Sequence, residues 1–208
     1  MSGLRETKKQ ATRQALADAA VRIVLTEGYD ALSVAAVAAA AGVSPRTFHN
    51  YFGNLDDALM DFVRTTFAIL AEDVRALPKD MNILDIFEEL AERGFNEEGV
   101  ELHSVASLFA MGELIENQRI RPTEGEPKDM AEQIAEPIFR AFADRLPDRD
   151  EFEVNVILQA TASAVIHAVR VFQHRVDAGE AVNPDEGRAL VRRAVDVLRD
   201  FSTRTRSA

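Results

Sequence analysis

Residues 33–52 read SVAAVAAAAGVSPRTFHNYF, and this stretch decides the fold. Ser33 is a good N-cap for a short alanine-rich helix that ends at Gly42. Ser44 then caps a second helix of about eight residues, whose first position is Pro45. Small alanines let the two helices approach closely, and Gly42 can take the positive φ that the turn between them requires. The spacing is that of a helix-turn-helix.

The second helix of this pair has an apolar side and a polar side. Phe48 and Phe52, four residues apart, are expected to anchor it inward. The residues left facing outward are Pro45, Arg46, His49 and Asn50. An arginine can bridge guanine acceptors or a phosphate, an asparagine matches an adenine edge, and a histidine can donate or accept. Thr47 and Tyr51 add hydroxyl groups suited to phosphate oxygens.

The rest of the chain predicts an all-α fold of about nine helices, because no segment alternates with period 2 and no hairpin signal occurs. The expected helices run from about Thr7 to Glu27, between Ser33 and Gly42, from Pro45 for about eight residues, from near Asn54 to about Leu77, from about Met81 to Arg93, Glu97 to Gln118, Lys128 to Arg145 and Asp148 to Ala178, and from Pro184 onward. Residues 119–127 are expected to form a loop, and Pro137 to kink its helix.

Charge divides the chain into two expected domains. The whole chain of 208 residues has a net charge of −11, but residues 1–54 hold six Lys or Arg against four acids. Residues 55–208 hold the remaining 18 basic and 31 acidic side chains. A cationic head of 1–54 on an acidic body of 55–208 suggests that only the head meets a polyanion, unless the asymmetry is a chance fluctuation.

Composition excludes several classes of protein. Hydrophobic residues make up 47% and charged residues 28%, which is enough apolar material for a core. There is no cysteine, so disulfides and thiolate sites are excluded. The apolar stretch 34–43 is too short to cross a bilayer, and residues 1–10 lack the apolar region of a secretion signal. We therefore expect a cytoplasmic protein without a membrane partner.

Catalysis is not expected. None of the histidines (His49, His103, His167 and His174) follows a glutamate by three residues, as the helical diiron enzymes require. No HExxH zinc motif, glycine-rich phosphate loop or GxSxG elbow occurs. Paired acids such as Asp56 and Asp57 fit first helical turns or solvated faces. We expect no catalytic residue, no metal and no cofactor.

The last two helices predict self-association. Apolar residues occur on all sides of the helix between Val154 and Val171, so it needs cover on every side. The last helix carries a similarly wide stripe, made of Leu190, Val191, Ala194, Val195, Leu198 and Phe201. Two such neighbours meeting their symmetry mates would form a four-helix homodimer interface. The alternative is a central core helix in a monomer.

The N-terminal third of the chain resembles the DNA-binding domain of TetR-family transcriptional regulators. The features that carry the resemblance are TRQALADAAVRIVLTEGYDALSV at 12–34 and AAAAGVSPRTFHNYFGNLDDAL at 38–59. The resemblance implies a ligand-responsive bacterial regulator that binds a palindromic operator in double-stranded DNA as a homodimer. It further implies a repressor that a small molecule releases from the operator.

Carried over position by position, the resemblance places phosphate contacts at Ser33, Thr47 and Tyr51 and base contacts at Pro45, Arg46, His49 and Asn50, beside the cap Ser44. The family usually has tyrosine in place of His49 and lysine in place of Leu55. Loss of that lysine should remove about one phosphate contact per subunit. Arg5, Lys8 and Lys9 of the basic arm compensate for it if they reach DNA; the alternative is a disordered tail.

The resemblance also implies an effector pocket among the later helices. Candidate lining residues are Phe67, Phe87, His103, Ser107, Phe109, Met111, Phe142, Gln159, Ser163 and His167, with the core as the alternative place for each phenylalanine. Their chemistry predicts a mainly apolar or amphipathic effector. Effector binding is expected to tilt the fourth helix and so change the spacing of the two recognition helices. An alternative is a helix-turn-helix adaptor that binds protein instead of DNA.

Overall fold

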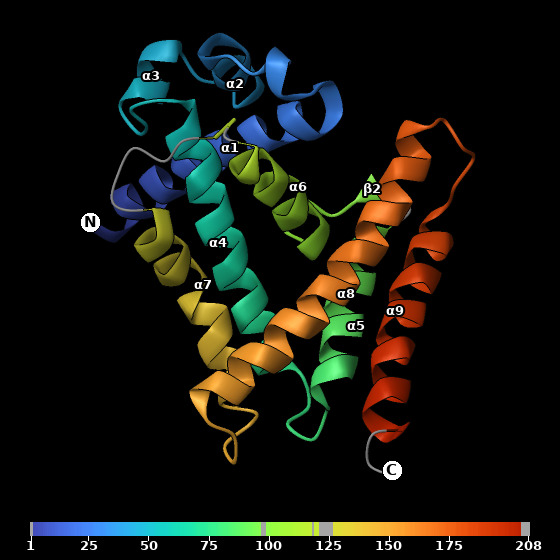
Figure 1. Cartoon of the computed structure of the whole chain (residues 1–208). Helices are drawn as coiled ribbons and strands as arrows, with labels where there is room; N and C mark the ends of the chain where they lie inside the picture. The colour runs from blue at the N-terminus through green and yellow to red at the C-terminus, as the bar shows by residue number, and fades with distance from the viewer. Residues whose placement is uncertain (1, 97–98, 118, 121–126, 205–208) are drawn as a thin grey trace. The chain divides into compact units, whose positions relative to one another are not determined.

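The computed structural model describes residues 2–96, 99–117, 119–120 and 127–204, and these form nine α-helices (Figure 1). The helices are α1 (Ser2–Glu27), α2 (Val34–Ala40), α3 (Pro45–His49), α4 (Leu55–Ala76), α5 (Ile83–Arg93), α6 (Val105–Glu116), α7 (Pro127–Ala143), α8 (Glu151–Asp177) and α9 (Pro184–Arg204). A 3-10 turn, η1 (Tyr29–Ala31), follows α1. The predicted all-α fold class is confirmed for this part of the chain.

Local capping explains why several helices begin where the sequence predicts. Ser33 Oγ accepts a hydrogen bond from the amide of Ala36 at 3.2 Å, and Ser44 Oγ accepts one from Thr47 at 3.1 Å. Asn183 Oδ1 likewise accepts from Glu186 at 3.1 Å, one residue before Pro184 starts α9. These side chains satisfy amides that a helix leaves without an intrahelical partner.

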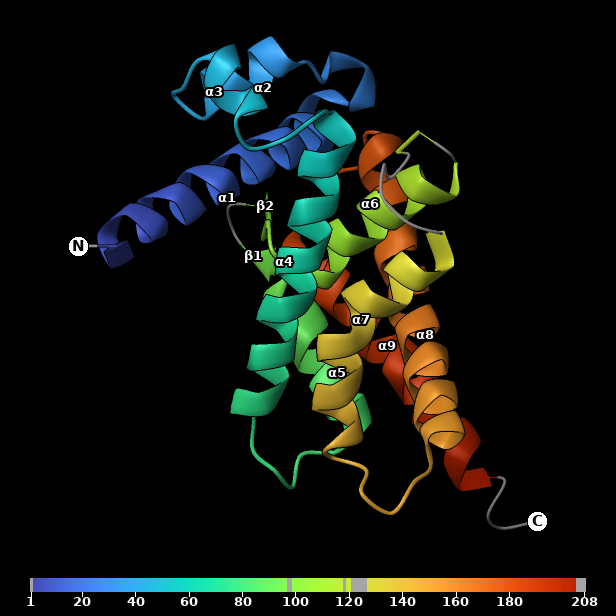
Figure 2. The ribbon, with the colours of Figure 1, turned by 90° about the vertical axis from the view of Figure 1, so that its left-hand side faces the viewer.

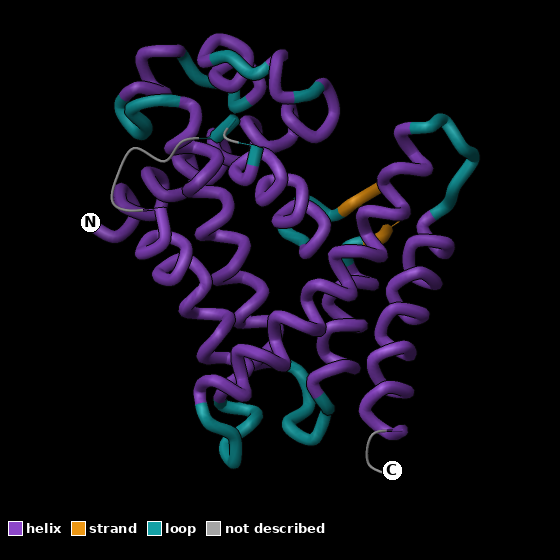
Figure 3. Tube along the Cα trace, in the orientation of Figure 1, coloured by secondary structure: helices purple, strands orange, loops and turns teal. Residues whose placement is uncertain are grey.

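Three sequence-based boundaries are wrong. Helix α1 begins at Ser2 instead of Thr7, so the basic arm is helical and not a disordered tail. Helix α3 has five residues instead of about eight. Helix α6 begins at Val105 instead of Glu97, because a short antiparallel pair, β1 (Phe95–Asn96) and β2 (Gly99–Val100), precedes it (Figure 3). Most of the predicted loop at 119–127 lies outside the described residues.

The chain divides into two compact units, which contain residues 1–66 with 110–134 and residues 67–109 with 135–208. In the first unit, α1 passes beneath α2 and α3 (Figure 2). Its fully buried side chains include Leu16, Val37, Phe48, Leu59 and Phe62. This core fixes the helix-turn-helix on α1 and the start of α4. The division at residue 54 into a DNA-binding and a ligand-binding domain is functional, and stays a prediction.

Aromatic pairs organise the core of the second unit. Phe87 of α5 stacks on Phe142 of α7 with ring centres 4.8 Å apart. Phe95 of β1 meets Phe172 of α8 edge-on at 5.1 Å. Helix α9 returns along α8, and the two pack side by side (Figure 1). Residues from α5, α7, α8 and α9 thereby form one apolar cluster.

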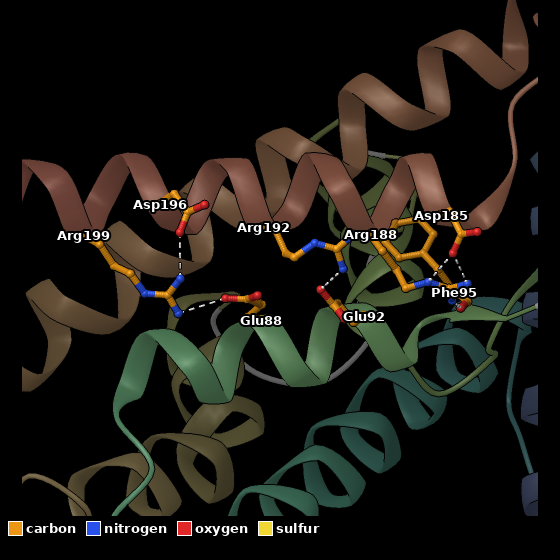
Figure 4. A network of polar contacts seen from close by, with 8 residues as sticks. All are labelled: Glu88, Glu92, Phe95, Asp185, Arg188, Arg192, Asp196 and Arg199. Atoms are coloured by element: carbon orange, nitrogen blue, oxygen red, sulfur yellow. Dashed lines mark hydrogen bonds and ion pairs between the residues drawn. The ribbon is translucent and has the colours of Figure 1, made fainter.

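Ion pairs fasten α9 to α5 (Figure 4). Arg199 pairs with Glu88 at 2.9 Å, and Arg192 pairs with Glu92 at 2.7 Å. Arg188 donates to the backbone carbonyl of Phe95. Each pair is partly exposed and contributes little free energy alone, but together they fix which face of α9 is turned toward α5. The opposite face of α9 is left outward.

Gly187 and Gly112 form a matched pair of tests for this packing. A Cβ atom at Gly187 would lie 2.5 Å from the ring of Phe95, which is 3% exposed. Gly187→Ala should therefore lower the free energy of unfolding by about 1–3 kcal/mol through overpacking. At Gly112 a Cβ would meet nothing within 4 Å, so Gly112→Ala should raise it by about 0.5–1 kcal/mol. Urea unfolding measures both, and equal effects would contradict the packing at Phe95.

Candidate nucleic-acid interface

Helix α3 is held by its apolar side and presents its polar side to solvent. Phe48 is fully buried and Phe52 is 3% exposed, with ring centres 5.7 Å apart. On the opposite edge the exposed side chains are Ser44, Pro45, Arg46, His49 and Asn50. Thr47 and Tyr51 are half-buried beside them. The structure thus brings together the predicted recognition residues on one short, outward edge; their contact with DNA stays a prediction.

Several cationic groups of the first unit are also open to solvent. Arg46 forms no ion pair with another described residue, so its guanidinium is available to an external acceptor. Lys8 and Lys9 are exposed on α1, and Ser33 is exposed at the start of α2. Leu55, the first residue of α4, is half-buried and offers no cation where the resembling family usually has lysine.

An arginine that sequence reasoning missed ties the recognition helix to α1 and α4. The guanidinium of Arg13 pairs with both carboxylate oxygens of Asp61, at 3.0 and 2.8 Å. It also donates to the carbonyl of Tyr51 at 3.1 Å and lies 4.5 Å from the ring centre of Phe52. The one available signal was an acid, Asp61, within the apolar stripe of α4.

A second unpredicted cluster lies at the end of α1. The hydroxyl of Tyr29 lies 2.6 Å from the carbonyl of Arg119 and 3.2 Å from a carboxylate oxygen of Asp56. The guanidinium of Arg119 pairs with Asp30 at 3.1 Å. Burial and the Asp56 carboxylate raise the pKa of Tyr29 above its usual value, because both disfavour the phenolate. The cluster joins the segment after α6 to η1 and to the start of α4.

The structure places the candidate effector residues in several different surroundings. Phe87 and Phe142 stack within the apolar core of the second unit. Ser107 is buried, and its hydroxyl donates to the carbonyl of Glu101 at 3.3 Å. Other candidates are placed as follows: Phe67 half-buried on α4, His103 half-buried before α6, Phe109 half-buried on α6 beneath the guanidinium of Arg170, and Met111 buried in the first unit.

Three further candidates lie on the outer face of α8. Gln159, Ser163 and His167 follow one another at helical spacing, and all three are exposed. His167 does not lie on the apolar stripe of α8 that packs inward, which carries Val165, Val169 and Phe172. A role of these three residues in effector binding stays a prediction.

The outer faces of α8 and α9 carry an apolar groove of about 370 Å³. Its lining residues are Ala164, His167, Ala168, Val171, Leu190, Arg193, Ala194, Val197 and Leu198. Along the same two helices, Phe152, Val197 and Phe201 are 76%, 62% and 72% exposed. Within the described residues, α8 is the one helix long and apolar enough to cross a membrane, a test that core helices of soluble proteins also pass. These faces need apolar cover.

The cap of α3 offers a test of how this interface is held. Ser44→Ala should lower the free energy of unfolding by about 1 kcal/mol, because the amide of Thr47 loses its acceptor. Ser44→Asp keeps an acceptor at the cap and should unfold like the parent, while its negative charge weakens DNA binding. Urea unfolding and DNA titration separate the two effects. Equal stability of the alanine variant and the parent would show that the cap contributes nothing.

Comparison with known proteins finds relatives of this segment. The sequence model described as "Bacterial regulatory proteins, tetR family" matches residues 16–57. A helix-turn-helix-type transcriptional regulator named BetI from Rhizobium meliloti (strain 1021) is 37% identical over 67 residues, which are 32% of this chain and 33% of the relative. An uncharacterised helix-turn-helix-type regulator from Haemophilus influenzae is 32% identical over 80 residues. The chain matches about a third of the length of these relatives.

Solved structures share the fold over most of the chain. The fatty acid degradation regulator FadR from Bacillus halodurans superposes with a TM-score of 0.56 at 16% identity, over 90% of this chain and 94% of that one. A protein from Mesorhizobium loti described as a TetR-family transcriptional regulator gives 0.50 at 13% identity, over 90% and 95%. These likenesses concern the fold alone.

Proposed function

We propose that this chain, a TetR-family transcription regulator, represses its target by binding a palindromic operator as a homodimer and is released by a small effector. It acts in the cytoplasm, where the chromosome is. The observation that carries the proposal is the outward edge of α3, where Arg46, His49 and Asn50 are exposed while Phe48 is buried. This edge offers hydrogen-bonding groups that match base edges in the major groove.

The uneven distribution of charge along the chain favours duplex DNA over a protein partner for residues 1–54. Residues 1–54 are cationic on a chain whose net charge is −11. A duplex attracts the head and repels the body, so the two charges together orient the molecule on DNA. The exposed Lys8 and Lys9 supply phosphate contacts in this arrangement.

A second copy of the chain is the proposed cover of α8 and α9. A two-fold axis would place the groove of one protomer against that of its partner, and Phe152, Val197 and Phe201 would leave water. Two copies carry two α3 helices, whose spacing must match one helical turn of DNA or a multiple. A two-fold symmetric dimer reads two inverted half-sites, so the proposed operator is palindromic.

The proposed effector is mainly apolar or amphipathic. The second unit contains stacked and edge-on aromatic pairs and few buried charges, so an internal site formed by rearrangement of these residues would be apolar. Helix α4 runs from the helix-turn-helix at Leu55 into the second unit beyond Thr66. Effector binding that favours one tilt of α4 would shift the equilibrium between DNA-binding and free states.

Selection from a pool of random duplexes tests the function. The full chain should enrich one palindromic sequence, and binding to it should weaken steeply with salt. A plot of log affinity against log salt gives the number of phosphates neutralised, and a competitor of unrelated sequence gives the specificity ratio. Enrichment of no sequence, or binding without salt dependence, would refute the proposal and favour the protein adaptor.

A further inference from the structure

We infer that Arg13 is a positioning residue for DNA reading: it sets the orientation of α3 against α4 by linking Asp61 to the end of the recognition helix. The inference rests on the proposed function. The side chain of Arg13 starts on α1, so it belongs to neither of the two helices that it joins. Its contacts reach α4 at Asp61 and the residues directly after α3 at Tyr51 and Phe52.

The contact of Arg13 with α4 is bidentate. Arg13 meets Asp61 by two parallel hydrogen bonds, and the Asp61 side chain is 12% exposed. A planar guanidinium bound to a carboxylate through two atoms fixes an angle as well as a distance. Asp61 lies within α4, so the direction of α4 determines where the Arg13 guanidinium lies.

Arg13 contacts the chain just after the C-terminal end of α3, where a contact can fix the position of that helix. The carbonyl of Tyr51 belongs to the turn that ends the helix, where backbone acceptors lack helical donors, and Arg13 donates to it at 3.1 Å. The same guanidinium covers Phe52, whose ring packs on Phe48 inside α3. A change in Arg13 therefore moves the buried side of the helix whose exposed side carries Arg46 and Asn50.

The clamp that Arg13 forms between Asp61 and Tyr51 accounts for how the five-residue helix α3 holds one orientation. Helix α3 is too short to be stable on its own and depends on tertiary contacts. Its cap at Ser44 fixes the first turn, and Arg13 fixes the last. A tilt of α4 moves Asp61 and is passed to the end of α3 through Arg13.

The test compares Arg13→Lys with Arg64→Lys in the full chain. Both arginines contact Asp61, but Arg64 does so through one bond at 3.4 Å and is 55% exposed. Lysine keeps the charge at either position and loses the planar fork. Both variants and the parent are titrated with the duplex that the parent selects from a random pool and with a duplex of unrelated sequence at the same salt concentration.

Arg13→Lys should weaken binding to the selected duplex about tenfold and to the unrelated duplex less than about twofold, because phosphate contacts are less sensitive than base contacts to helix orientation. Arg64→Lys should change neither by more than about twofold. Loss of folded protein lowers both affinities alike. The ratio of the affinity for the selected duplex to that for the unrelated duplex therefore reports the position of α3 and not the stability of the chain. Asp61→Asn provides a second variant and should lower the same ratio.

Three results would overturn the inference. An unchanged affinity ratio in both Arg13→Lys and Asp61→Asn, with the parent still selecting its duplex, would refute the clamp and leave the proposed function standing. An equal fall of the ratio in Arg64→Lys would show that the effect is not specific to the two-bond contact of Arg13, because Arg64 meets Asp61 through a single bond. Selection of no duplex by the parent would remove the proposed function and this inference together.

Discussion

Val197→Asp should leave the chain folded but monomeric. Val197 lies on α9 in the apolar groove and is 62% exposed in the single chain, so an aspartate there meets water and not the core. In the proposed dimer the same position is covered, and the two-fold axis buries two carboxylates at once, whose charge Arg193 of the same groove offsets only in part. Taking each carboxylate out of water costs several kcal/mol, so dimer dissociation should become at least about 1,000-fold easier.

Light scattering during size-exclusion chromatography at micromolar concentration measures the change in mass. Leu25→Asp is the matched control, because Leu25 is a large apolar residue on α1 that is 41% exposed and lies outside the α8–α9 face. This control should remain dimeric. Helical content by circular dichroism should be the same in both variants. A dimeric Val197→Asp chain, or a monomeric parent, would remove α8 and α9 as the interface.

The monomeric variant should also lose its operator. A dimer binds the second half-site at the high effective concentration set by the first, whereas two monomers bind independently. Affinity for the selected duplex should therefore fall by more than about 100-fold, while affinity for a single half-site stays within about twofold of that of the parent chain. Titration with whole and half operators distinguishes loss of dimerisation from damage to α3.

The features predicted correctly from sequence are local in the chain. Ser33, Ser44 and Asn183 cap amides three residues ahead, and Gly42 has the positive φ of 68° that the turn requires. Such contacts depend on residue type and spacing alone. The inward side of α3 was predictable for the same reason, because Phe48 and Phe52 lie one helical turn apart.

The features that were missed depend on distant partners. Arg13 and Asp61 are 48 positions apart, and Tyr29 contacts Arg119 across 90 positions. Apolar periodicity does not tell which charged side chains meet once helices pack. The β1–β2 pair was missed because two residues per strand are too few for a period-2 pattern.

The effector candidates could not be resolved from sequence because core and pocket use the same residues. Phe87 and Phe142 are candidate pocket residues because they are aromatic, but they stack on each other inside the core. His167 lies on a helix that is apolar on all sides, so periodicity alone did not tell its inner face from its outer one. The structure resolves the face, because His167 is exposed.

Arg46→Ala should produce the largest loss of specific DNA binding among changes to α3. Arg46 is exposed on the outward edge and has no ion-pair partner among the described residues, so its removal leaves the fold intact. A lost bidentate contact to guanine costs about 1–3 kcal/mol. The proposed dimer loses this contact twice on one operator, which gives about 2–6 kcal/mol, or roughly 30- to 25,000-fold.

The base dependence of the loss tells what Arg46 contacts. If it reads guanine, Arg46→Ala should equalise the affinities of duplexes that differ at one base step in each half-site, and should leave binding to unrelated DNA nearly unchanged. If it contacts phosphate, binding to all duplexes should weaken alike, and the salt slope should fall by about one per subunit. Arg22→Ala, at an exposed arginine on α1 outside the predicted recognition edge, is the control and should retain the parent's preference. Full retention of affinity and preference by Arg46→Ala would exclude this edge of α3 as the reading surface.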